Sequence, residues 1–177
     1  MTLRDRLSRI ITMNAPEPYL IVCLCTGNIC RSPMAEGVLA DALVHTGACV
    51  VSAGVAAPRG VPASEHAVTA CAEIGIDIAQ HRSQPLTAEL VGRADLILAM
   101  EMHHLLAARS VAPAETGKMH LLSQYAAGDD RAAPLGVSDP IGGDLNEYRE
   151  TLGVLRTYLA RALPRLERDI ESRALES

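Results

Sequence analysis

A chain of 177 residues, of which 49% are hydrophobic, is long enough for one compact domain with a substantial core. Its net charge of -5 gives no electrostatic basis for binding nucleic acid, and no stretch approaches the roughly 20 apolar residues of a membrane-spanning helix. We therefore expect neither a nucleic-acid nor a membrane partner. Five irregularly spaced cysteines without an evident export signal predict a reducing, cytoplasmic location.

The chain divides into a short N-terminal extension, 1–18, and a single domain, 19–177. The extension mixes apolar and basic side chains and predicts a short helix. In the domain, near-continuous apolar runs predict strands over 19–24, 49–53, 95–100 and 118–122. Helices are expected over 34–44, 64–74, 87–91 and 102–109, followed by a long terminal helix whose apolar stripe runs from Tyr148 to Leu163, with a kink or break at Pro164.

Strands that alternate with helices predict an α/β fold. We expect a doubly wound, four-stranded parallel sheet with helices on both faces. Ligands of such sheets bind at the carboxyl ends of the strands. The segment 126–144 is rich in Gly, Pro and Asp, and we interpret it as an active-site loop rather than a domain boundary.

The segment CTGNICRSP, residues 25–33, lies between the first expected strand and the first expected helix. Gly27 and Asn28 tolerate left-handed backbone conformations, so successive amide groups can turn inward as a nest for an anion, backed by a helix N-terminus. A dianionic phosphate would fit such a loop. The residues expected to cradle it are Thr26, Gly27, Asn28, Ile29, Cys30, Arg31 and Ser32.

The positive field of this loop favours a thiolate at Cys25, the candidate nucleophile. Arg31 carries a planar fork that matches two phosphate oxygens and can follow them into the transition state. Ser32 can donate its hydroxyl to the sulfur and stabilise the thiolate as a leaving group. This chemistry requires no cofactor, and no metal site is expected because Cys23, Cys25 and Cys30 lack a companion at a zinc-like spacing.

The run from Val22 to Glu36 resembles the low-molecular-weight protein tyrosine phosphatases. Further similarities are Ser52-Ala53-Gly54, Gly75-Ile76-Asp77, His81-Arg82-Ser83, Ala94-Asp95-Leu96-Ile97-Leu98 and Ser138-Asp139-Pro140. The resemblance covers the chain from about residue 19 to the C-terminal helix. It implies that 19–177 is a phosphatase domain that acts on a phosphorylated protein through a phosphocysteine intermediate.

The resemblance also implies roles for residues outside the loop. Asp139, the aspartate before proline, would protonate the leaving phenolate and then take a proton from the attacking water. Asn28 would hold the strained loop through a hydrogen bond with Ser52, and His81 would support the site. A histidine after a loop is, however, more often structural.

The other cysteines and histidines give weaker signals. In the family the pair equivalent to Cys25 and Cys30 forms a reversible disulfide, so Cys30 is a candidate redox partner; a buried structural role for it stays open. Core positions are predicted for Cys23, Cys49 and Cys71, and surface positions for His103 and His104.

Substrate specificity depends on the walls of the pocket. Eukaryotic members have aromatic residues where this chain has Val55-Ala56-Ala57 and Ile141-Gly142-Gly143. The sequence is closer to a bacterial subgroup that includes protein-arginine phosphatases, which typically carry threonine at the position of Ile29. The aliphatic Ile29 favours phosphotyrosine, with phosphoarginine as the alternative.

Two further functions are less favoured. An arsenate reductase would need a relay cysteine near Met100-Glu101-Met102, where none is present. An inactive phosphoprotein-binding module is expected to lack at least one of the residues Cys25, Arg31 and Asp139, and all three are present.

Overall fold

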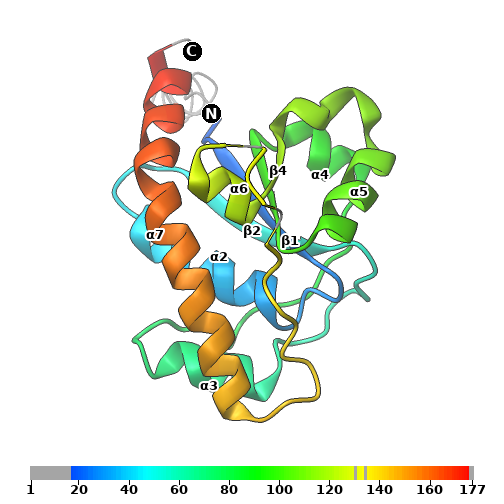
Figure 1. Cartoon of the computed structure of the whole chain (residues 1–177), viewed down its shortest axis with the longest axis vertical. Helices are drawn as coiled ribbons and strands as arrows, with labels where there is room; N and C mark the ends of the chain where they lie inside the picture. Colours follow the sequence, from blue (N-terminus) through cyan, green and yellow to red (C-terminus); the bar gives the residue numbers. More distant parts are fainter. Residues whose placement is uncertain (1–16, 130, 134, 176–177) are drawn as a thin grey trace, which may run out of the picture.

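The computed structural model describes residues 17–129, 131–133 and 135–175 (Figure 1). The helix expected in the N-terminal extension lies outside these residues. Four strands form one parallel sheet in the order β2-β1-β3-β4, which confirms the predicted sheet. The strands are β1 (Leu20–Cys25), β2 (Cys49–Gly54), β3 (Leu96–Ala99) and β4 (Met119–Leu121).

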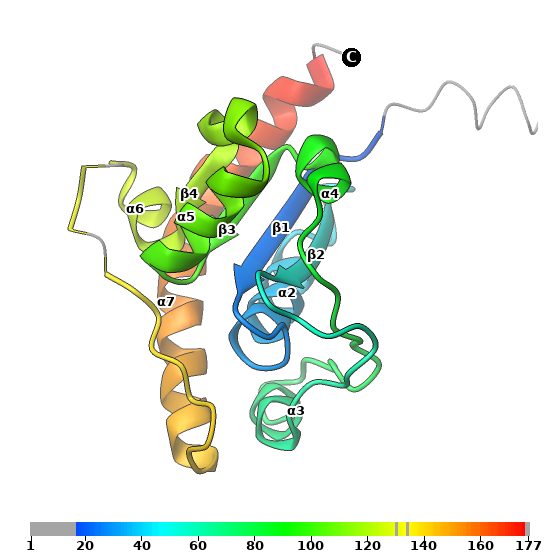
Figure 2. The ribbon, with the colours of Figure 1, turned by 90° about the vertical axis from the view of Figure 1, so that its right-hand side faces the viewer.

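Helices cover both faces of the sheet (Figures 1 and 2). One face packs against α2 (Arg31–Ala42), α3 (Glu65–Ala72), α6 (Leu122–Ala127) and α7 (Leu145–Leu175). The other face packs against α4 (Ala88–Arg93) and α5 (Met102–Val111), and a 3₁₀ helix, η1 (Pro113–Lys118), precedes β4.

Strand β1 is buried on both sides because it lies between β2 and β3 and between two helical layers. Its side chains alternate between the layers: Ile21 and Cys23 join the cluster that contains α2 and α7, whereas Val22 and Leu24 join the cluster that contains α4 and α5. All four are fully buried. This double burial explains the near-continuous apolar run in the sequence.

Capping residues account for small shifts in the helix boundaries. The Ser64 hydroxyl accepts the Ala67 N–H, and the Thr87 hydroxyl accepts the Leu90 N–H at 3.1 Å, so each residue caps its helix from outside. α2 begins at Arg31, three residues earlier than expected, because Pro33 fits the first turn of a helix.

Of the two alternatives predicted at Pro164, a kink or a break, the break is wrong. Pro164 lies inside α7. It has no N–H to offer the carbonyl of Ala160, but both residues are exposed, so water can satisfy that carbonyl. A buried stripe continues past the proline and holds the helix through Leu155, Leu159, Ala162, Leu166 and Ile170. Neither α7 nor any other helix in the described ranges is long and apolar enough to cross a membrane.

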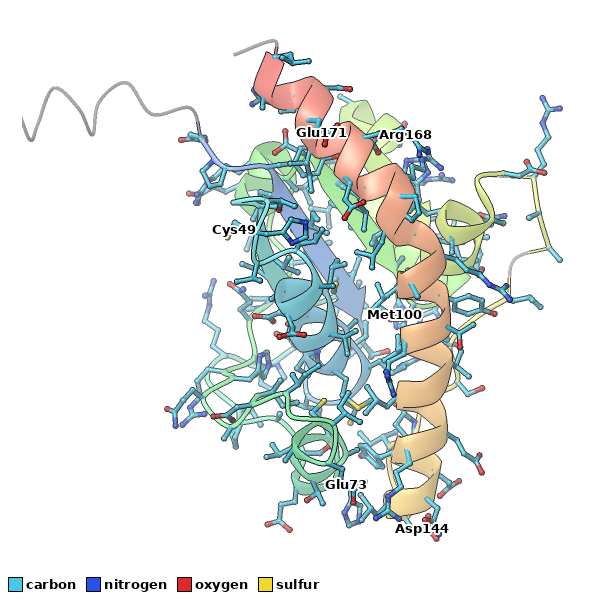
Figure 3. All side chains as sticks on the ribbon, turned by 90° about the vertical axis from the view of Figure 1, so that its left-hand side faces the viewer. Cys49, Glu73, Met100, Asp144, Arg168 and Glu171 are labelled. Atoms are coloured by element: carbon cyan, nitrogen blue, oxygen red, sulfur yellow. The ribbon has the colours of Figure 1, made fainter. Side chains whose placement is uncertain are left out.

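Two other features differ from the predictions. Leu122 starts the short helix α6 instead of ending a strand, and neither α6 nor η1 was predicted. Cys23 and Cys71 are buried as predicted, but Cys49 is only half-buried because β2 is an edge strand (Figure 3).

The start of α7 is fastened to the end of α3. Arg149 donates to both carboxylate oxygens of Glu73, at 2.8 and 2.6 Å, near Asp144 at the lower end of the molecule in Figure 3. Solvent screens an exposed pair of this kind, so it orients the end of the helix more than it stabilises the fold.

Candidate active site

The carboxyl ends of three adjacent strands meet at the loop predicted to bind phosphate. β1 ends at Cys25, β2 ends at Gly54, and β3 is followed by Met100 and Glu101. The parallel register pairs Cys25 with Gly54 and Leu24 with Ala99. The sheet therefore brings side chains from three distant segments to the loop at residues 25–32, as expected for a ligand site in this kind of fold.

The sulfur of Cys25 lies among hydrogen-bond donors. Ser32 Oγ is 2.9 Å from Sγ, and the backbone N–H of Asn28 donates to Sγ at 3.3 Å. The Asn28 φ of 55° is the left-handed conformation that an anion nest requires. Because α2 begins at Arg31, its N-terminal dipole adds a positive field. The arrangement can stabilise negative charge both on the sulfur and on a bound anion.

The side chain of Asn28 braces the loop from within the protein. Its Nδ2 donates to Ser52 Oγ at 2.7 Å and to Ser32 Oγ at 2.9 Å, and its Oδ1 accepts the Gln84 N–H at 2.8 Å. The hydrogen bond between Asn28 and Ser52 implied by the family resemblance is thus present. Since Ser32 Oγ accepts from Asn28, its own hydrogen can be directed at the Cys25 sulfur.

Two further side chains extend this brace. Ser52 donates to Glu36 Oε2 at 2.5 Å, and His81 Nε2 is hydrogen-bonded to the Asn28 carbonyl at 2.7 Å. His81 therefore contacts the loop, as the resemblance implied. Glu36 was not predicted to take part, although it lies on α2 just beyond the loop. Its carboxylate is 3.7 Å from His81 Nδ1, so the two supports also face each other.

The guanidinium of Arg31 is buried between two carboxylates. Nη2 donates to Asp139 Oδ2 at 2.5 Å, and Nη1 donates to the Val137 carbonyl at 2.9 Å and to the Glu101 carboxylate. Asp139 is thus brought to the loop from the segment between α6 and α7. Burial disfavours ionised Glu101, but the hydrogen bond and charge of Arg31 outweigh it, so the pKa of Glu101 is below its ordinary value.

Glu101 is a site residue that sequence reasoning missed. The available signal was its position directly after the strand that forms β3, because the end of a neighbouring parallel strand lies at the same sheet edge.

One donor of Arg31 is left without a protein partner. Nε is buried and has no acceptor among the described residues. An unsatisfied buried donor costs about 1 to 3 kcal/mol, and an anion bound in the nest would remove this cost. The fork of Arg31 and the backbone nest together therefore suit a tetrahedral oxyanion.

Residues 20–172 match the family described as low molecular weight phosphotyrosine protein phosphatase. The chain belongs to this family. It is a cysteine-dependent phosphatase of phosphorylated proteins.

Relatives of this phosphatase fall into two groups. A probable low molecular weight protein-tyrosine-phosphatase, EpsP of Ralstonia nicotianae, is 39% identical over 82% of this chain and 94% of its own length. A protein-arginine-phosphatase of Geobacillus stearothermophilus is 37% identical over 85% of this chain and 97% of its own. A solved cysteine-to-serine mutant of the YwlE arginine phosphatase, with a phosphorylated active-site serine, has a TM-score of 0.78 at 36% identity, covering 85% of this chain and 97% of that chain.

The phosphatase contains a buried histidine where the sequence predicted an exposed one. His104 is fully buried, whereas His103 is exposed as predicted. His104 Nε2 lies 2.8 Å from Thr26 Oγ1, and Nδ1 accepts the Glu101 N–H at 3.1 Å. The signal was helical spacing, because position 104 shares a face of α5 with Ala108, which is buried in the core.

The side chains of Glu101, His103 and His104 are the one group in the described ranges whose ligand atoms are close enough to share a metal ion, within 4.8 Å. Both ring nitrogens of His104 are already hydrogen-bonded, which favours a role in the protein framework over metal binding.

Cys30 contacts residues of α7 and of the N-terminus of α3. Its sulfur is 3.3 Å from the Tyr148 hydroxyl and 3.6 Å from Ser64 Oγ, and burial raises the pKa of its thiol. Cys25 and Cys30 are both free thiols. These contacts suit the buried structural role for Cys30, and its pairing with Cys25 under oxidation stays a prediction.

Proposed function

We propose that this phosphatase hydrolyses phosphotyrosine in proteins, with Cys25 as the nucleophile, Arg31 as the phosphate ligand and Asp139 as the acid and base. One observation carries the proposal. The Cys25 sulfur accepts from the Asn28 N–H and contacts the Ser32 hydroxyl, inside the same loop whose Arg31 reaches Asp139.

In the first step the Cys25 thiolate attacks phosphorus and the bond from phosphorus to the phenolic oxygen breaks. Asp139 gives its proton to that oxygen, so tyrosine leaves neutral and the phosphoryl group stays on sulfur. Arg31 and the amides of the nest bind the equatorial oxygens, where charge accumulates. Arg31 Nε, buried without a partner among the described residues, is available for one of these contacts.

In the second step water attacks phosphorus while Asp139 accepts a proton from it. The bond from phosphorus to sulfur breaks, inorganic phosphate forms, and the electron pair returns to Cys25. Ser32, 2.9 Å from the sulfur, stabilises the departing thiolate. The solved YwlE structure is a cysteine-to-serine mutant with a phosphorylated active-site serine, and it supports a covalent route because a side chain in a related site carries phosphate there.

Specificity for phosphotyrosine rests on Ile29. Its side chain is half-buried and lies beside Gly27, 3.6 Å from the position that a Cβ would take there. An aliphatic side chain offers apolar contact to a phenyl ring and no polar partner to a guanidinium. An unpaired polar group in a closed pocket costs about 1 to 3 kcal/mol, so phosphoarginine should bind less well.

A protein-arginine phosphatase is the second candidate. The identity of 37% to a protein-arginine-phosphatase favours it, as does the absence of aromatic residues at Val55-Ala56-Ala57 and Ile141-Gly142-Gly143. Without aromatic rings in its walls, the pocket lacks about 0.5 to 1.5 kcal/mol of stacking energy for each ring that could pair with phosphotyrosine.

Kinetics on matched peptides separate the two candidates. We expect kcat/KM to be higher for a phosphotyrosine peptide than for the same peptide with phosphoarginine, and Cys25→Ser to abolish turnover of both. A preference for phosphoarginine would overturn the specificity and leave the chemistry intact. Turnover by the Cys25→Ser variant would overturn the mechanism.

The proposed chemistry also suits the expected location. A thiolate nucleophile is inactivated by oxidation, so we propose that the enzyme acts in the reducing cytoplasm. We also propose that residues 19–177 are the phosphatase domain, and the family match over 20–172 supports these bounds.

A further inference from the structure

His104 forms hydrogen bonds with both of its ring nitrogens. Nδ1 accepts the backbone N–H of Glu101, so in this pairing the ring hydrogen sits on Nε2. Nε2 therefore donates to Thr26 Oγ1, 2.8 Å away. The ring is fully buried and has one defined tautomer, which makes the contact with Thr26 directional.

Glu101 and His104 form two reciprocal hydrogen bonds at the start of α5. The Glu101 carboxylate accepts the backbone N–H of His104 while the His104 ring accepts the backbone N–H of Glu101. The same carboxylate binds Arg31. A change at His104 would therefore reach Arg31 through Glu101.

The two contacts reach opposite ends of the phosphate-binding loop. Thr26 directly follows Cys25, and Arg31 closes the loop at the start of α2. α5 packs on the face of the sheet away from α2 and α7, so His104 joins the loop to the other helical layer.

We propose that His104 is a positioning residue for phosphate transfer, which sets Thr26 directly and Arg31 through Glu101. The inference rests on the proposed mechanism, in which the loop amides and Arg31 bind the transferred phosphoryl group, and it is independent of the substrate's identity. His104 itself does not touch the reacting atoms. The His104 ring must be neutral to hold Glu101, because a protonated ring could no longer accept the Glu101 N–H.

The surroundings of His104 keep it neutral. Burial, with the nearby charges of His103 and Arg31, lowers the pKa of His104 to about 4, while Glu101 acts in the opposite direction. The His103 ring lies 3.9 Å from the His104 ring, centre to centre, and Thr26 faces it from the loop. The hydrogen bond to Thr26 should therefore persist throughout the pH range in which the enzyme works.

Two substitutions remove this hydrogen bond from opposite ends. In His104→Asn the amide oxygen can replace Nδ1 and keep the cap on Glu101, but nothing reaches Thr26. Thr26→Val removes the acceptor with little change of shape and leaves α5 untouched. His45→Asn is the matched control, because His45 is exposed, lies 3.7 Å from a carboxylate oxygen of Glu167 and follows the end of α2 that is far from the loop.

The measurements are kcat/KM on an aryl phosphate, competitive inhibition by inorganic phosphate, and the melting temperature of the full-length chain. We expect each single variant to lose about tenfold in kcat/KM, the scale of one well-placed hydrogen bond, and to bind inorganic phosphate more weakly. His45→Asn should stay within about twofold of wild type in both.

The double variant tests whether the two substitutions remove the same hydrogen bond. If both substitutions remove the same interaction, His104→Asn with Thr26→Val should lose little more than either alone. The proposal would be overturned if kcat/KM of the double variant fell by about a hundredfold, the product of the two single losses. It would also be overturned if kcat/KM of the single variants stayed within about twofold of wild type. If His104→Asn fails to fold, Thr26→Val alone still tests it.

Failure of the wild type to turn over the aryl phosphate would count against the proposed function and not against this inference. Protection of Cys25 from iodoacetamide by inorganic phosphate requires no turnover. We expect Thr26→Val to need about tenfold more phosphate for the same protection; equal protection would overturn the role of His104.

Discussion

Arg31 Nη2 donates to Asp139 Oδ2 at 2.5 Å, so in the absence of phosphate the proposed general acid is bound to the proposed phosphate ligand. The Asp139 side chain is 34% exposed, and its second oxygen accepts the Ile141 N–H at 3.3 Å. A phosphate dianion that binds Arg31 through Nη2 must therefore displace this carboxylate, whereas Nε has no partner among the described residues to displace. This exchange of partners gives Asp139 two measurable effects.

Asp139→Asn should separate catalysis from phosphate binding. We expect kcat to fall by about 10² to 10⁴ for esters with poor leaving groups and much less for esters whose phenolate leaves unaided. Inorganic phosphate should inhibit the variant about three- to tenfold more strongly, because the competing negative charge is gone. If kcat falls equally for all leaving groups, the acid is another residue, and Asp129, Asp130 and Asp144 are the candidates from the same segment of the sequence.

Gly54 allows the end of β2 to approach the phosphate-binding loop. A Cβ at Gly54 would lie 2.4 Å from the Thr26 carbonyl oxygen and 3.0 Å from the Asn28 nitrogen, both backbone atoms that cannot move alone. Gly54→Ala should lower kcat/KM by at least about tenfold and stability by about 1 to 3 kcal/mol.

The matched control for this substitution is Gly92→Ala. A Cβ at Gly92 would meet nothing within 4 Å, and alanine in a helix is favoured by about 0.5 to 1 kcal/mol over glycine. Chemical denaturation and kinetics should show it fully active and no less stable than wild type. Equal activity in the two variants would mean that the loop tolerates displacement.

The buried His104 should make part of the stability depend on pH. Its pKa is about 4 in the folded protein and 6.5 as the ordinary value, so between these values the unfolded chain binds a proton that the folded chain does not. Stability should be complete above about pH 6.5 and fall towards pH 4, by at most about 3 kcal/mol from this group. In urea titrations the free energy of unfolding of wild type should therefore fall relative to that of His104→Asn as the pH falls. Parallel curves would show that His104 binds its proton equally in both states.

Ile29→Thr should shift specificity from phosphotyrosine towards phosphoarginine. The substitution leaves the loop backbone unchanged and adds one hydroxyl to the pocket wall, which can partner a guanidinium. The ratio of kcat/KM values for matched peptides should move by about three- to tenfold. An unchanged ratio would place the determinant elsewhere in the pocket.

Local sequence features were enough to predict the phosphate-binding loop. The site residues that were not predicted are placed by long-range packing. The strand before Cys25 and the turn around Asn28 could be predicted because burial and backbone preference act on neighbouring residues. Glu101 and His104 were missed because their place beside the loop follows from the register that pairs Leu24 with Ala99, and the signals at each residue indicate burial or a sheet edge without giving that register.

The same contrast explains the errors in the helices. Pro164 is a local signal for a break, but the buried residues on either side of it outweigh one missing hydrogen bond. The helix α6, from Leu122 to Ala127, is too short to show a periodic pattern, so the strand before it was extended into it.

Trapping the covalent intermediate tests the central claim most directly. Wild-type enzyme is mixed with an aryl phosphate that has a good leaving group, denatured during turnover, and the peptides are analysed by mass spectrometry. We expect one phosphoryl group on Cys25, together with a burst of phenolate equal to the enzyme concentration, and neither in Cys25→Ala. Phosphate on another side chain, or continued turnover without a covalent phosphoryl group, would contradict it.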